Sequence, residues 1–122
     1  MSSYKPEGWA TVTPRLFTDD TQGLVDFLKH VFDAQGEVQT GRPTEMCIGD
    51  SRIMISDGGG IRTASPAFLY VYVSDTDETH RRAIEAGART IEAPSSTPYG
   101  DRRATVVDRW GNSWQIATRL PI

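Results

Sequence analysis

The sequence contains few of the side chains that form disulfides, metal centres and nucleophilic catalytic sites. It has one cysteine, Cys47, and two histidines, His30 and His80. A lone cysteine excludes an internal disulfide. The chain also lacks a recognisable Ser–His–Asp set, a pair of catalytic carboxylates and a Cys-x-x-Cys motif. The common hydrolase, glycosidase and thiol-redox mechanisms are therefore not indicated.

Three further absences limit the partners and the location of the protein. No apolar run approaches the ~20 residues that a membrane-spanning helix needs. The opening stretch MSSYKPEGWA has no apolar segment of the signal-peptide type. Positive charge is not in excess, because the formal net charge is -3, and proteins that bind nucleic acid usually present a basic face. We expect a cytoplasmic protein that binds neither membrane nor nucleic acid.

The residues that are present predict a single α+β domain, residues 1–122, made of two similar halves. Apolar residues make up 38% of the chain and charged residues 24%, as in ordinary globular proteins. The halves, 9–57 and 66–118, flank a linker at 58–65 that begins with three glycines. Each half shows the order strand, helix, three strands. The first half has predicted strands at 9–18, 37–39, 44–48 and 52–56 and a helix at 21–34; the second has strands at 67–73, 89–92, 103–107 and 113–118 and a helix at 76–86.

Capping residues support both predicted helices. Asp20 and Asp75 are suitable N-caps, and Glu78 follows Asp75 at the spacing of a capping box. Gly36 and Gly87 can adopt the left-handed backbone conformation that ends a helix. The first helix has an apolar stripe at i, i+3, i+4, i+7 and i+8, formed by Leu24, Phe27, Leu28, Val31 and Phe32. In the second helix Ala83 and Ile84 are predicted to face inward.

Several stretches resemble the vicinal oxygen chelate superfamily, which includes glyoxalase I, bleomycin-resistance proteins, fosfomycin-resistance enzymes and extradiol dioxygenases. They are TPRLFTDD, VDFLKHVFDA, IGDSRIMISD, YVYVSDTDE, AIEAGA and YGDRRATVVDRWGNSWQIAT. The last is similar to the small PhnB-like members. The resemblance implies two βαβββ modules that form a curled mixed sheet, or cup, with helices outside. It also implies that two chains commonly pair, so we expect a homodimer.

Enzymes of this superfamily hold a divalent metal between the first and last strands of each module. The resemblance places the four ligand positions on Thr13, Met54, Phe68 and Gln115. Threonine is a poor ligand, methionine suits soft metals, and phenylalanine cannot coordinate, which leaves the amide oxygen of Gln115 alone. We therefore expect neither a metal nor another cofactor, and interpret Gln115 as a hydrogen-bonding group. A displaced ligand set, such as Glu45 with Gln115 and a histidine, stays open.

Strand alternation predicts a cup with aromatic and cationic walls. The predicted lining is Thr13, Arg15, Phe17, Arg52, Met54, Ser56, Phe68, Tyr70, Tyr72, Ser113, Gln115 and Ala117, with Tyr99 and Trp110 at the rim. Flat rings, guanidinium groups and an amide suit a planar or partly anionic small molecule. Phe17 and Phe68 are equally compatible with a plain core.

Three functions remain open on this reading. The first is a metal-free small-molecule binding protein that sequesters or senses a compact aromatic or anionic compound, as in drug resistance. The second is a metal-dependent lyase, isomerase or dioxygenase with displaced ligands. The third is an interaction module whose cup is filled by its own side chains.

Overall fold

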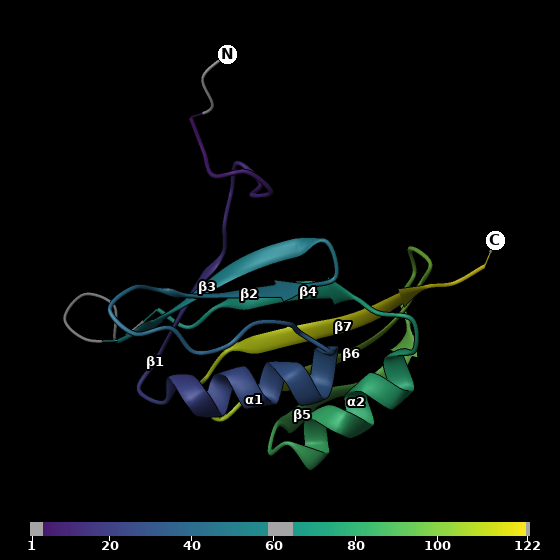
Figure 1. Cartoon of the computed structure of the whole chain (residues 1–122). Coiled ribbons are helices and arrows are strands. Elements are labelled where there is room, and N and C mark those ends of the chain that lie inside the picture. Colours follow the sequence, from purple (N-terminus) through teal and green to yellow (C-terminus); the bar gives the residue numbers. More distant parts are fainter. Residues whose placement is uncertain (1–3, 59–64, 122) are drawn as a thin grey trace.

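The computed structural model describes residues 4–58 and 65–121 and has an α+β architecture of two mixed β-sheets and two helices (Figure 1). Most of the predicted linker 58–65 lies outside the described residues. Neither helix within these ranges is long enough and apolar enough to cross a membrane. The predicted fold class, α+β with two repeated halves, is confirmed.

The first sheet has the strand order β1-β3-β2. Strand β1 (Arg15–Thr18) runs parallel to β3 (Ser51–Asp57), and β2 (Thr44–Ile48) runs antiparallel to β3. Helix α1 (Thr21–Phe32) connects β1 to the segment before β2.

The second sheet has the order β4-β7-β6-β5 and repeats this plan with one more strand. Strand β4 (Phe68–Tyr72) is parallel to β7 (Ser113–Arg119), which is antiparallel to β6 (Asp101–Val107). Strand β5 (Arg89–Ser96) pairs with β6 after helix α2 (Thr76–Glu85). The match of β1, β3 and β2 with β4, β7 and β6 is the duplication that the sequence predicts.

Two predicted strands of the first half are wrong in extent. The strand predicted at 37–39 is reduced to an isolated bridge between Gln35 and Cys47, because Gly36 has a φ of 138° that interrupts extended pairing. The strand predicted from Trp9 begins only at Arg15. Pro14 stands before it and lacks a backbone donor, and Val12, expected to face with Leu16, is 80% exposed.

The helix starts agree with prediction, and one of the ends does not. Asp20 Oδ1 accepts a hydrogen bond from the Gly23 N–H at 3.0 Å, and Asp75 Oδ1 accepts one from the Glu78 N–H at 3.1 Å. Helix α1 ends at Phe32 with Asp33 as its left-handed C-cap, at a φ of 55°, rather than at Gly36.

The inward face of α2 differs from prediction at one residue. This face consists of Thr76, Thr79 and Ala83, whose i, i+3, i+7 spacing leaves Ile84 exposed. The glycine after the helix behaves as predicted, because Gly87 follows its end with a φ of 98°.

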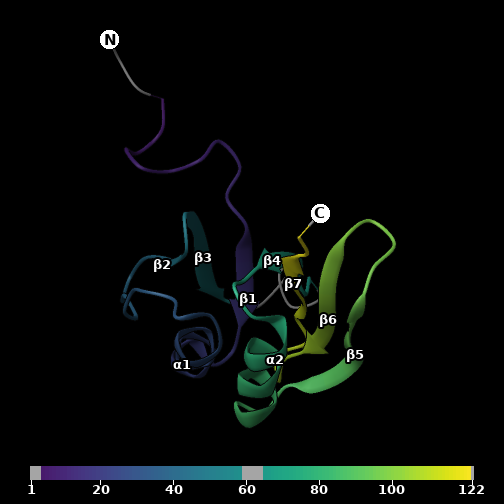
Figure 2. The ribbon, with the colours of Figure 1, turned by 90° about the vertical axis from the view of Figure 1, so that its right-hand side faces the viewer.

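One hydrophobic core joins the two halves. Trp114 of β7 is fully buried, and its ring centroid lies 5.2 Å from that of Phe32 and 6.5 Å from that of Phe27, both on α1. The core also contains Leu16 and Ile55 from the first sheet. Figure 2 shows α1 and α2 beside each other below the strands. Each sheet therefore has one face against the core and one open face.

A buried carboxylate organises the β6–β7 turn and its link to β4. Asp108 Oδ1 accepts hydrogen bonds from the Trp110 and Asn112 N–H groups at 2.9 Å. Its Oδ2 accepts from Asn112 Nδ2 at 3.1 Å and from Trp114 Nε1 at 2.9 Å. Asn112 Oδ1 in turn accepts from the Ala67 N–H at 2.9 Å, just before β4. One carboxylate thereby sets the turn, the core tryptophan and the start of the neighbouring strand.

The substitution Asp108→Ala should lower the free energy of unfolding by about 3 kcal/mol or more, since it leaves several buried donors without an acceptor. Urea unfolding followed by circular dichroism measures this loss. Asp26→Ala on the exposed side of α1 is the matched control and should change the value by about 0.5 kcal/mol or less. Equal losses in the two variants would contradict a structural role for Asp108.

Candidate functional site

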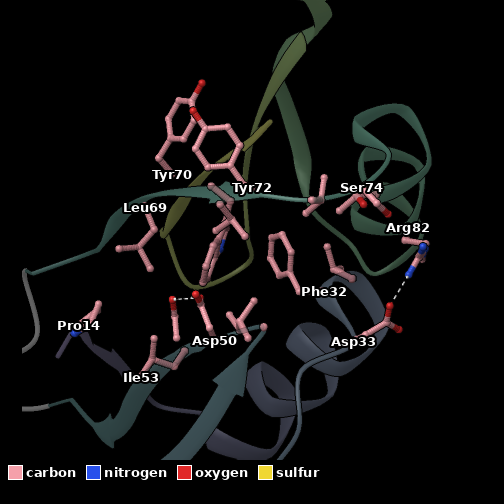
Figure 3. Close-up of a pocket in the computed structure, with 18 residues that line it drawn as sticks. Pro14, Phe32, Asp33, Asp50, Ile53, Leu69, Tyr70, Tyr72, Ser74 and Arg82 are labelled. Carbon is pink, nitrogen blue, oxygen red and sulfur yellow. Dashed lines mark hydrogen bonds and ion pairs between the residues drawn. The ribbon is translucent and has the colours of Figure 1, made fainter. Parts of the chain in front are cut away.

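The open face of the second sheet brings four predicted site residues together. Alternation along β4 turns Phe68, Tyr70 and Tyr72 away from the core, and Phe68 is 66% and Tyr72 57% exposed. Figure 3 shows both tyrosines pointing to the opposite side of β4 from Leu69. In the parallel pairing of β4 with β7, Tyr70 lies beside Gln115.

The two tyrosine hydroxyls share one buried acceptor. Tyr70 donates to Asp101 Oδ2 at 2.5 Å, and Tyr72 donates to the same oxygen at 2.9 Å. Asp101 begins β6 and has no exposed surface. The tyrosine rings lie 5.4 Å apart with an interplanar angle of 61°. The carboxylate therefore fixes both rings at their outer ends, while β4 fixes them at their Cα atoms.

Tyr99 and two arginines complete this arrangement, which we call the tyrosine platform (Tyr70, Tyr72 and Tyr99 with Asp101). Arg103 Nη1 donates to the Tyr99 hydroxyl at 2.6 Å, and that hydroxyl lies 3.3 Å from the Tyr70 hydroxyl. Arg119 Nε lies 3.1 Å from Asp101 Oδ1, an oxygen that accepts no hydrogen bond from the described residues. Arg119 also donates to the Tyr99 carbonyl at 2.7 Å.

Within the platform, the pKa values of Asp101 and Tyr70 are shifted in opposite directions. The hydrogen bond from Tyr70 is the largest influence on the Asp101 carboxyl; together with the Tyr72 hydrogen bond and the Arg119 charge, it lowers the pKa against the opposing effect of burial. Burial and the hydrogen bond to Asp101 raise the pKa of Tyr70. These shifts favour a neutral Tyr70 phenol that donates to an ionised Asp101 carboxylate.

Gln115 has a hydrogen-bonding partner on the neighbouring strand. Its Nε2 lies 3.4 Å from Thr105 Oγ1, and that hydroxyl donates to Glu92 Oε1 at 2.8 Å. Arg103 forms an ion pair with Glu92, with Nε and Oε1 3.1 Å apart. Hydrogen bonds from Arg103 and then Thr105 lower the pKa of Glu92.

The predicted residues of the first half lie on a different open face. Arg15, Met54 and Glu45 are neighbours across β1, β3 and β2. Arg15 Nε donates to Ser56 Oγ at 3.0 Å, and its guanidinium lies 5.7 Å from the centre of the Phe17 ring. No hydrogen bond or ion pair between described residues joins this face to the tyrosine platform.

Three predicted lining residues lie elsewhere. Thr13 precedes β1, so Arg15 takes the place beside Met54. Arg52 turns to the N-terminal segment, where its Nε donates to the Gly8 carbonyl at 3.0 Å and its guanidinium lies 5.4 Å from the Trp9 ring. Trp110, expected at the rim, packs edge-on against Phe27 of α1, with ring centroids 6.1 Å apart.

Comparisons with known proteins identify the family. Residues 10–116 match the model of the Glyoxalase/Bleomycin resistance protein/Dioxygenase superfamily. The chain belongs to this superfamily.

Solved structures share the fold of this chain. TioX from Micromonospora sp. ML1 has a TM-score of 0.75 at 25% identity, with 91% of this chain and 99% of that chain covered. The fosfomycin resistance protein FosX from Mesorhizobium loti has a TM-score of 0.69 at 19% identity, with 89% and 91% covered. An uncharacterized protein from Mycobacterium tuberculosis is 28% identical, with 86% of this chain and 72% of that protein covered. Placement with the small PhnB-like members stays a prediction.

The side chains of this superfamily member do not fit the divalent metal that its enzymes use. His30 Nε2 lies 2.9 Å from Glu85 Oε1, and His80 Nε2 lies 2.9 Å from Thr90 Oγ1, so both histidines are engaged on the helices. Glu45 is paired with Arg42. Within residues 4–58 and 65–121, no three His, Cys, Asp or Glu side chains are grouped so that they could hold a metal ion. The donors near Gln115 are hydroxyls and one carboxylate that is already paired.

Sequence reasoning missed Asp101, Glu92 and Arg119. Two signals could have found them. Tyrosine hydroxyls on a sheet need partners when they are held against the protein, and Asp101 has the same strand parity as Arg103 and Thr105, which face the platform side of β6. The pairing of β6 with β7, which the sequence alone does not give in register, decides that these groups meet.

The double substitution Tyr70→Phe/Tyr72→Phe should raise the pKa of Asp101, because the carboxylate loses two donors that stabilise its charged form. Carboxyl carbon NMR shifts measured against pH report this change.

A carboxyl group whose pKa is lower in the folded state than in the unfolded state stabilises the protein at pH values above its unfolded-state pKa. This stability is lost as the pH falls through the folded-state pKa. The wild type should therefore lose more unfolding free energy than Asp101→Asn between neutral pH and about pH 3. Identical Asp101 titration curves in the wild type and the Tyr70→Phe/Tyr72→Phe variant would show that the two hydroxyls do not lower the pKa of Asp101.

Proposed function

We propose that the protein is a metal-free small-molecule binding protein of the glyoxalase/bleomycin-resistance type, which sequesters or senses a compact aromatic or anionic compound. The observation that carries this proposal is the tyrosine platform, an exposed set of rings fixed by a buried carboxylate. No bond is broken in the proposed action. A role in drug resistance, as in the fosfomycin resistance protein FosX, belongs to this proposal.

The rigidity of the platform supports recognition by stacking. Exposed aromatic side chains normally have free rotamers, and ordering them on binding costs free energy. Here the hydroxyls of Tyr70 and Tyr72 are held by Asp101 before any ligand arrives. A planar ligand would therefore gain contacts with the rings and lose little conformational entropy of the tyrosine side chains.

Charges at the edge of the platform support the acceptance of an anionic group. Arg119 is exposed, and its guanidinium reaches both Asp101 and the Tyr99 carbonyl. Arg103 is partly exposed and contacts Tyr99 and Glu92. A ligand anion placed beside the rings would meet two guanidinium groups with several N–H donors between them.

The exposure of the same rings supports pairing of two chains. Phe68, Tyr70 and Tyr72 form an apolar strip along β4 that monomeric proteins usually cover. The proposed homodimer places an open face of the partner over this strip, so the ligand site has one wall from each chain.

Titration with naphthalene-1,5-disulfonate, a planar aromatic dianion, tests the ligand class. Binding should raise the melting temperature of the wild type. Tyr72→Leu should weaken binding about five- to tenfold, because it removes one stacking ring. Tyr72→Phe, the matched control, keeps the ring and should bind within about threefold of the wild type.

Two outcomes would overturn the proposal. One is equal binding of the disulfonate by Tyr72→Leu and Tyr72→Phe, which would show that the platform does not contact the ligand. The other is elemental analysis that finds a stoichiometric divalent metal in purified protein, which would favour the metal-dependent enzyme.

Sedimentation velocity tests the pairing of chains. The purified protein should sediment as a dimer of about twice the chain mass, and Phe68→Asp should shift it toward the monomer by placing a charge in the covered strip. Val12→Asp, on an exposed residue outside the strip, is the control and should leave the dimer intact. A wild type that sediments as a monomer at every concentration would exclude the shared site.

A further inference from the structure

A pocket of about 430 Å³ lies on the core side of β4, opposite the tyrosine platform (Figure 3). It is bounded by β4, the β2–β3 turn, the end of α1 and one face of α2. Its walls combine apolar side chains such as Leu69, Val71 and Trp114 with polar ones that include Asp33, Asp50 and Arg82. This volume and lining are those of a site for a small organic molecule. We call it the inter-module pocket.

Polar groups gather at one end of the inter-module pocket. Thr79 and Arg82 are three residues apart on the same face of α2, and both line the pocket. Thr79 is only 4% exposed as a residue, but its hydroxyl is not among the fully buried side-chain atoms of the described residues that lack a partner. Because Thr79 lines the pocket, its hydroxyl is available to a polar group of a ligand at this end.

Arg82 has donor capacity to spare. Its Nη1 lies 3.5 Å from Asp33 Oδ2 and its Nε lies 3.5 Å from Glu78 Oε2, so both ion pairs are long. A guanidinium carries five N–H donors and binds carboxylates best through two parallel hydrogen bonds. The Asp33 side chain is 84% exposed, so it can turn to water when another carboxylate takes its place.

We propose that the inter-module pocket binds a small monocarboxylate with an apolar body. The carboxylate receives hydrogen bonds from Arg82 and the Thr79 hydroxyl, and the hydrocarbon packs against Leu69, Val71 and Trp114. Figure 3 places Arg82 and Asp33 at one end of the pocket and Pro14 at the other, so an elongated molecule has its charged head at α2. Tyr70 and Tyr72 border this pocket as well as the platform, but their rings point to the opposite side of β4, so a ligand in the pocket meets other side chains than a ligand on the platform.

Isothermal titration with octanoate, octanol and octylamine tests the ligand class, because the three probes share one chain and differ in the head group. Octanoate should bind with one site per chain. Octanol should bind about tenfold more weakly, since it lacks the charge that strengthens hydrogen bonds to Arg82. Octylamine should show no binding, because its ammonium group would face a guanidinium.

Conservative variants locate the site. Arg82→Met keeps the length of the side chain and should weaken octanoate about tenfold or more, and Thr79→Val should weaken it about threefold. Asp33→Asn should strengthen octanoate about threefold, because it removes the competing carboxylate, and asparagine tolerates the φ of 55° at this position. Asp26→Asn, an exposed position on α1 that does not line the pocket, should leave octanoate binding unchanged.

Three outcomes would overturn the proposal: no binding of octanoate to the folded wild type, equal binding of octylamine, or unchanged octanoate affinity in both Arg82→Met and Asp33→Asn. A fourth outcome that would overturn it is occupation of the pocket by a second copy of the chain. This would appear as dimers that dissociate in Leu69→Trp, because the added ring fills the pocket. Failure here would leave the platform proposal untouched, because that proposal is tested with Tyr72 variants and a different probe.

Discussion

The carboxylate of Asp108 is the constraint on which the rest of the structure depends. It receives four hydrogen bonds within the turn between β6 and β7, and one of them comes from the buried indole of Trp114. The indole fills the core between α1 and β7, and Asn112 carries the connection to the start of β4. Because the register of β4 on β7 follows from this turn, the positions of Tyr70 and Gln115 side by side follow as well.

Much of the fold could be predicted from the sequence because its signals are local. The apolar stripe of α1 and the caps at Asp20 and Asp75 act within one or two helical turns, and both helices start where these residues predict. The predicted first strand is too long because alternation alone does not show that a segment has a partner strand. Residues 9–14 alternate, yet the backbone pairs with β3 only from the Pro14 carbonyl onward, which accepts a hydrogen bond from the Met54 N–H.

The candidate site was predictable only in part, because its chemistry comes from pairing between distant strands. Strand parity places Phe68, Tyr70 and Tyr72 on one face, and the structure has them there. Parity does not say which acceptor meets their hydroxyls, since Asp101 is about thirty residues away in sequence and reaches them through β7. The prediction that Arg52 lines the cup is wrong for a similar reason. The partner of Arg52 is the Gly8 carbonyl, which lies in a segment without regular secondary structure.

Strand β4 separates two environments that its alternation makes chemically different. On one side Tyr70 and Tyr72 present rings held by an ionised carboxylate, while on the other Leu69 and Val71 face the inter-module pocket. On each side the guanidinium groups already have carboxylate partners: Arg119 has Asp101, Arg103 has Glu92, and Arg82 has Asp33. An incoming anion must therefore exchange with a resident carboxylate rather than meet a free cation. The exchange is most favourable where the resident pair is long and its carboxylate can reach water, a condition that Arg82 and Asp33 meet and that the buried Asp101 does not.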